Sequence, residues 1–79
     1  MPTVVEEGEY KFIIHTNELP YEPPHVHVRF NGDEVRVNLD SGRFMETPSG
    51  GKKSEIMKIY KEHLVEIRKE WDRLHHEEQ

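Results

Sequence analysis

The sequence predicts an α+β fold in which an antiparallel sheet of three or four strands packs against one long C-terminal helix. Three features indicate this fold: the turn-forming pair Asn31-Gly32 lies between two strand-like runs, an alternating run begins at Glu9, and apolar residues recur every three or four positions after Lys53. Proline and glycine fall in the first part of the chain, which is typical of strands and turns followed by a helix. We therefore interpret the chain as a single domain, with a β-sheet part over residues 1–51 and the helix over 52–79.

The first expected strand runs from Glu9 to His15. Its β-branched and aromatic residues follow a period of two, in which Tyr10, Phe12 and Ile14 alternate with Lys11, Ile13 and His15. The segment from Thr16 to Pro24 contains three prolines, so it cannot continue the strand and is expected to be a loop.

The central expected element is a β-hairpin over His25–Phe30 and Asp33–Leu39. Asn31-Gly32 supplies the two positive-φ residues of a type I′ turn, which fixes the register of the two strands. That register places Val26, Val28, Val35 and Val37 on one face. On the other face it pairs Arg29 with Glu34, His27 with Arg36 and His25 with Asn38.

The remainder of the chain is expected to form a short strand and the helix. Asp40 to Gly42 is predicted to be a turn, Arg43 to Thr47 a fourth strand and Pro48 to Gly51 a connection. Ser49 or Ser54 is a suitable helix cap. The apolar stripe of the helix comprises Ile56, Tyr60, Leu64, Ile67, Trp71 and Leu74. This stripe is expected to cover the valine face, and His63 falls within it, where a core histidine bonded to a neighbouring polar atom is the simplest interpretation.

Composition excludes several classes of protein. The chain has 79 residues, no cysteine and a net charge of -5, so a disulfide scaffold, a thiolate metal cluster and a cationic field over the whole molecule are excluded. The longest apolar run, Phe12-Ile13-Ile14, is too short to span a bilayer, and the acidic start does not resemble a signal peptide, so we expect a cytoplasmic protein without a membrane partner. A domain this short buries only about 60% of its extended-chain surface, which also favours a homodimer.

Six histidines suggest two kinds of binding site. His25 and His27 would project from one strand in the same direction, about 7 Å apart, which suits two imidazole ligands of one divalent metal. His15 would be a third ligand, with oxygen donors drawn from Glu18, Glu22 or Asp40. The cation of Arg36, expected beside His27, opposes a metal ion and favours an anion instead.

The second hypothesis is an anion or RNA site on this polar face. It would gather a cationic patch on an acidic protein, formed by Lys11, His15, His25, His27, Arg29 and Arg36. His25 and His27 would be the candidate general acid and base for cleaving a phosphodiester, because imidazole titrates near neutrality. A third interpretation is that these histidines are ordinary strand residues without a ligand, and the sequence leaves all three open.

Several segments together resemble a family of small bacterial proteins of unknown function with a PPHVHV signature. The similarity covers Asn17-Glu18, Pro23 to Val28, Leu39 to Glu46, and the spacing of His63 eight residues before Trp71. Pro48 to Gly51 departs from the family pattern, which has Leu-Pro before the helix.

The resemblance implies a protein partner, because members of this family look like halves of toxin-antitoxin-like pairs. It also implies that His25 and His27, and less directly His63, are candidate site residues. From the sequence we therefore expect a protein-interaction module that binds a small partner through its histidine-rich face or an edge strand. The alternatives are an RNA-binding or RNA-cleaving protein and a divalent metal site, and whether the protein is an enzyme is left open.

Overall fold

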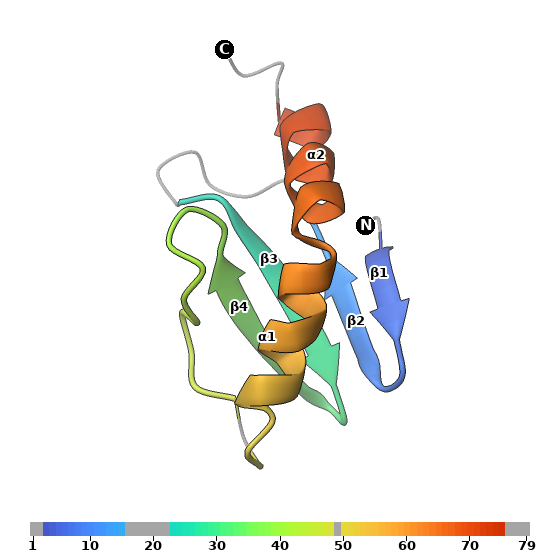
Figure 1. Ribbon diagram of the computed structural model, residues 1–79, viewed down its shortest axis with the longest axis vertical. Helices are drawn as coiled ribbons and strands as arrows, with labels where there is room; N and C mark the ends of the chain where they lie inside the picture. The colour runs from blue at the N-terminus through green and yellow to red at the C-terminus, as the bar shows by residue number, and fades with distance from the viewer. Residues whose placement is uncertain (1–2, 16–22, 49, 76–79) are drawn as a thin grey trace.

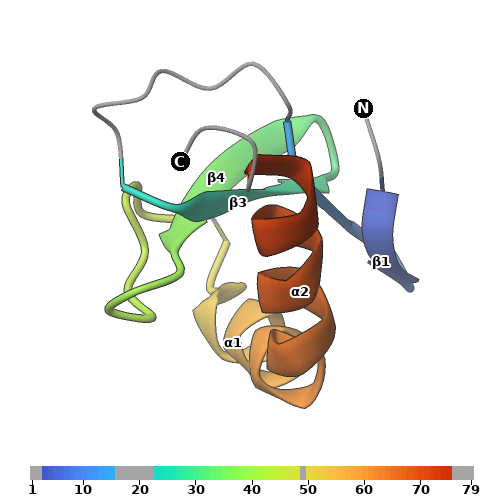
Figure 2. The ribbon, with the colours of Figure 1, turned by 90° about the horizontal axis from the view of Figure 1, so that it is seen from above.

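The computed structural model describes residues 3–15, 23–48 and 50–75 and confirms the α+β fold. Four antiparallel strands lie side by side in chain order, β1-β2-β3-β4 (Figure 1). Two helical segments follow and lie together on one side of the sheet (Figure 2). The elements are β1 (Thr3–Glu7), β2 (Tyr10–Ile13), β3 (His25–Phe30), β4 (Asp33–Asn38), α1 (Lys53–Glu62) and α2 (Leu64–His75).

The hairpin of β3 and β4 has the predicted register. Val28 faces Val35 and Val26 faces Val37, while His27 faces Arg36 and Arg29 faces Glu34. Asn31 and Gly32 have φ angles of 46° and 74°, the left-handed conformation that a type I′ turn requires. All four valines of this register are buried.

The fourth strand lies at the edge opposite to the predicted one. Residues 3–7 form β1, which pairs with β2 around a turn at Gly8, whose φ is 61°. The segment predicted as a strand, Arg43 to Thr47, makes only a single bridge between Phe44 and Val37. The acidic N-terminal segment is a strand because Val5 packs into the core and the β2 backbone supplies its hydrogen bonds, neither of which the local charge pattern indicates.

The helical region is interrupted at His63. Its φ of -116° is not helical, and its N–H is shared between the carbonyls of Ile59 at 3.1 Å and Tyr60 at 3.3 Å. Both segments remain on the same side of the sheet, so the single predicted helix becomes two consecutive ones. Lys52 precedes α1 without a side-chain cap and Ser54 lies inside it, whereas Ser49 lies outside the described residues.

The core lies between the valine face of the sheet and the helices. Its central members, which are fully or almost fully buried, are Phe12, Ile14, Val26, Val28, Val35, Val37, Ile56 and Ile67. Ile13 is also buried but lies outside this cluster, because its Cα partner in β3 is His27 on the opposite face. Neither described helix is long and apolar enough to cross a bilayer.

Candidate functional site

His25 is buried at the start of β3, whereas its predicted role in catalysis or partner binding would require an accessible side chain. Only 1% of its surface is exposed, and its ring lies 5.8 Å from that of Trp71 in α2. His25 Nδ1 lies 2.8 Å from the carbonyl oxygen of Pro23, and because a carbonyl can only accept, Nδ1 must carry a proton. This burial opposes a role for His25 in proton transfer to a bulky phosphodiester, which would have to reach the ring.

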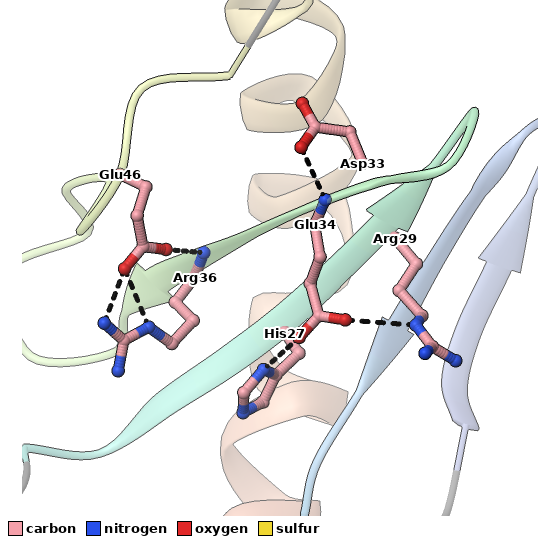
Figure 3. Close-up of polar contacts among 6 residues, drawn as sticks. All are labelled: His27, Arg29, Asp33, Glu34, Arg36 and Glu46. Carbon is pink, nitrogen blue, oxygen red and sulfur yellow. Dashed lines mark hydrogen bonds and ion pairs between the residues drawn. The ribbon is translucent and has the colours of Figure 1, made fainter.

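His27 lies on the same face of β3 as His25, on the polar side of the sheet, and contacts the carboxylate of Glu34 (Figure 3). The His27 Nδ1 to Glu34 Oε2 distance is 2.8 Å, and Arg29 Nε lies 3.1 Å from Glu34 Oε1. Partial burial of Glu34 opposes its ionisation. The contacts with His27 and Arg29 outweigh that effect and lower the pKa of Glu34, so the group is a carboxylate at neutral pH.

Arg36 is held by Glu46, which follows the bridge at Phe44. The Arg36 guanidinium donates two hydrogen bonds to Glu46 Oε2, and the Arg36 backbone N–H donates to Glu46 Oε1 at 2.9 Å (Figure 3). These donors hold the pKa of Glu46 below its usual range. The sequence analysis expected the cation of Arg36 to oppose a metal ion beside His27. In the structure the carboxylate of Glu46 offsets this charge.

The outer edge of β4 is closed by the same kind of contact along its length. The Glu34 N–H donates to the Asp33 carboxylate at 2.8 Å, the Arg36 N–H to Glu46, and the Asn38 N–H to the Arg43 carbonyl at 2.8 Å. A partner strand would have to displace these acceptors before it could pair with β4. The structure therefore disfavours β4 as the partner-binding edge.

The predicted cationic patch is largely neutralised. Arg29 and Arg36 face Glu34 and Glu46, so these four charges sum to zero. Lys11, the cross-strand partner of Arg29 in β2, is exposed and lines a hollow over the hairpin turn together with Arg29, Glu9 and Asp33. That hollow carries both signs of charge, which weakens the expected attraction for a phosphate backbone.

His15 completes a row of rings on this side of the sheet. Its ring centroid lies 4.0 Å from that of His27, and His27 lies 5.0 Å from His25. One donor atom from each of His15, His27 and Glu34 lies within 4.8 Å of the others. His25 is not a member of this group. Of the predicted oxygen donors, Asp40 lies elsewhere and pairs with Arg68, while Glu18 and Glu22 lie outside the described residues.

His63, which the sequence placed in the core, instead lies part-exposed between carboxylates. Its Nδ1 lies 2.6 Å from Glu66 Oε1 and its Nε2 lies 3.4 Å from Glu7 Oε1. The hydrogen bond with Glu66, supported by Glu7, raises the pKa of His63. The break in the helix turns this side chain toward β1, so it contributes to a junction of elements and not to the His27 site.

Two residues that the sequence did not select are central to the polar face. Glu34 was visible as the cross-strand partner of Arg29, and the hairpin register alone would have placed it near His27. Glu46 had no comparable signal, because its contact with Arg36 depends on the path of an irregular segment.

A separate apolar surface lies where α2 begins. Among the described residues, the large hydrophobic side chains classed as exposed are Leu64, at 39%, and Val65, at 70%. They line an open groove with Leu39, Arg68, Lys69 and Asp72. Leu39 and Leu64 also border a second hollow that reaches Met57 and Lys61, so the apolar surface continues across the helix junction.

Comparison with known proteins identifies a family but no characterised relative. Residues 9–72 match the family model described as "Domain of unknown function (DUF4160)". No curated protein and no solved structure matches the chain.

Proposed function

The chain belongs to the DUF4160 family, and we propose that it is a protein-interaction module that binds a small partner protein through the apolar surface at the start of α2. The observation that carries this proposal is the exposure of Leu64 and Val65, adjacent residues beside a groove. A small domain that leaves two neighbouring aliphatic side chains in water gains free energy when a partner covers them.

The charges around this groove indicate the chemistry of the partner. Lys69 lines it and Lys61 borders the adjoining hollow, whereas Arg68 is already paired with Asp40 and Asp72. A complementary partner would present an apolar helix or strand flanked by acidic residues. The similarity to bacterial proteins that look like members of toxin-antitoxin pairs makes the product of a neighbouring gene the first candidate.

The test is co-expression with the neighbouring gene, followed by co-purification and titration calorimetry. We expect a stable complex that Val65→Lys weakens at least tenfold, because the substitution introduces a charge into the apolar contact. His27→Gln serves as the matched control on the other side of the sheet and should bind as the wild type does. Absence of a complex, or equal weakening by both variants, would refute this surface. A homodimer dissociated by Val65→Lys would replace the proposed partner with a second copy of the chain.

A toxin-antitoxin role also predicts an effect of the same complex on cell growth. Expression of the neighbouring protein alone should arrest growth, and co-expression of this chain should relieve the arrest, whereas the Val65→Lys variant should not. Normal growth with the neighbouring protein alone would remove the toxin-antitoxin interpretation while leaving the interaction itself intact.

RNA binding or cleavage is the less favoured function. Arg29 and Arg36, the arginines that would bind phosphate, already face carboxylates. His25 is too buried to act together with His27 on a polymer. If RNA nevertheless binds here, its affinity should fall steeply as salt increases, because phosphate contacts release counterions.

A further inference from the structure

The polar side of the sheet brings two imidazoles and one carboxylate together from three different strands or their ends. His27 lies in β3, Glu34 in β4, and His15 follows the end of β2. Their donor atoms lie within 4.8 Å of one another. We propose that His15, His27 and Glu34 bind one divalent transition-metal ion, with zinc as the best-fitting ion.

The contact between His27 and Glu34 already has the dimensions of a coordination pair. Nδ1 and Oε2 are 2.8 Å apart. Two donors at zinc bond lengths of about 2.0–2.1 Å lie roughly 3 Å apart in a tetrahedral or octahedral shell. A metal ion would take the place of the proton that these two atoms now share, with only a small outward movement of both.

His15 is suited to be the third ligand. Its ring lies 4.0 Å from the ring of His27 in an edge-on arrangement, with an interplanar angle of 68°. His15 is part-exposed just beyond the end of β2, and one of its ring nitrogens lies within 4.8 Å of donor atoms of His27 and Glu34. Two imidazoles and one carboxylate are a common zinc ligand set, and the fourth position would be taken by water.

The charges around this position are balanced, so they do not oppose a cation. The carboxylate of Glu34 faces His27, and the carboxylate of Glu46 neutralises Arg36. Arg29 remains bound to the other oxygen of Glu34, so it would orient the carboxylate from outside the coordination shell. His25 would support the site by packing against the His27 ring, held in place by its bond to Pro23.

Zinc titration of the full chain, followed by calorimetry and by the imidazole NMR signals, tests the proposal. We expect one zinc ion per chain and joint shifts of the His15 and His27 signals. Glu34→Gln, which preserves the shape of the side chain, should weaken binding at least tenfold, and His27→Gln should abolish it. Circular dichroism of each variant without metal establishes that the fold is retained.

Two controls separate this site from other histidines. His63→Gln removes the imidazole of the second carboxylate-rich cluster, and a double variant, His75→Gln with His76→Gln, removes the pair near the C-terminus. Both should bind zinc as the wild type does. Failure of the wild type to bind stoichiometrically, or unchanged binding by His27→Gln, would overturn the proposal. Joint shifts of His25 and His27 without His15 would overturn the ligand set and restore the pair predicted from the sequence. Because no partner protein is needed, the result is independent of the interaction proposed above.

Discussion

Substitution of Glu46 tests the closure of the β4 edge. The Glu46 carboxylate accepts hydrogen bonds from the Arg36 backbone N–H and from its guanidinium. Both side chains are part-exposed, at 31% for Arg36 and 39% for Glu46, so we take the ion pair at no more than about 1 kcal/mol. A backbone hydrogen bond to a charged acceptor adds roughly 1 kcal/mol after allowance for exposure. We therefore expect Glu46→Ala to lower the free energy of unfolding by about 1–2 kcal/mol.

Urea unfolding monitored by Trp71 fluorescence measures this loss. A change of about 1–2 kcal/mol should lower Tm by roughly 4–15 °C in a domain of this size. Glu46→Gln should cost about half as much, because its amide oxygen can still accept from the Arg36 N–H. Hydrogen exchange at that N–H should accelerate more than exchange at Val28 in the centre of the sheet.

The pH dependence of stability tests whether the ionised form of Glu46 is the one that stabilises the fold. Arg36 lowers the pKa of Glu46 from its ordinary 4.5, so the stabilisation is complete above that pH and is lost as pH falls through the lower folded-state pKa. The difference in free energy of unfolding between the wild type and Glu46→Gln should therefore be larger at pH 7 than at pH 3. Glu6→Gln, at an exposed carboxylate on β1, is the matched control. Equal stability of wild type and Glu46→Ala, or an equal loss in Glu6→Gln, would refute the reasoning.

Three further predictions concern the core and two shifted ionisations. Ile56→Ala should destabilise the protein by about 2–5 kcal/mol in urea unfolding, because the side chain is fully buried and its removal leaves a cavity; a loss below about 1 kcal/mol would contradict this packing. Burial, reinforced by the hydrogen bond to Glu55, raises the pKa of Tyr10, so its neutral form stabilises the fold until pH rises through that value. Tyr10→Phe should accordingly remove the last phenol to ionise in an ultraviolet titration, and an unchanged titration would contradict the assignment. The hydrogen bond with Glu66 raises the pKa of His63 above 6.5, so protonated His63 stabilises the fold at low pH and this stabilisation is lost as pH rises through the folded-state pKa. In an NMR titration Glu66→Gln should lower the pKa of His63, and an unchanged value would exclude the contact.

The sequence by itself determined the hairpin and the faces of its strands. Asn31-Gly32 permits the left-handed turn, and strict alternation then leaves one register that buries all four valines. The same local logic placed Arg29 opposite Glu34 and His27 opposite Arg36. The period of three to four after Lys53 likewise indicated a helix over the valine face.

Tertiary structure decided which polar side chains meet. Trp71 packs against His25 across a long separation in the chain, and His25 is buried at 1% exposure. Glu46 reaches Arg36 through an irregular segment whose path no residue pattern encodes. Periodicity assigns a side chain to a face, but its partners depend on contacts between elements far apart in the sequence. For this reason only the folded chain showed that His25 is buried and that Glu34, with His15 and His27, makes up the proposed ligand set.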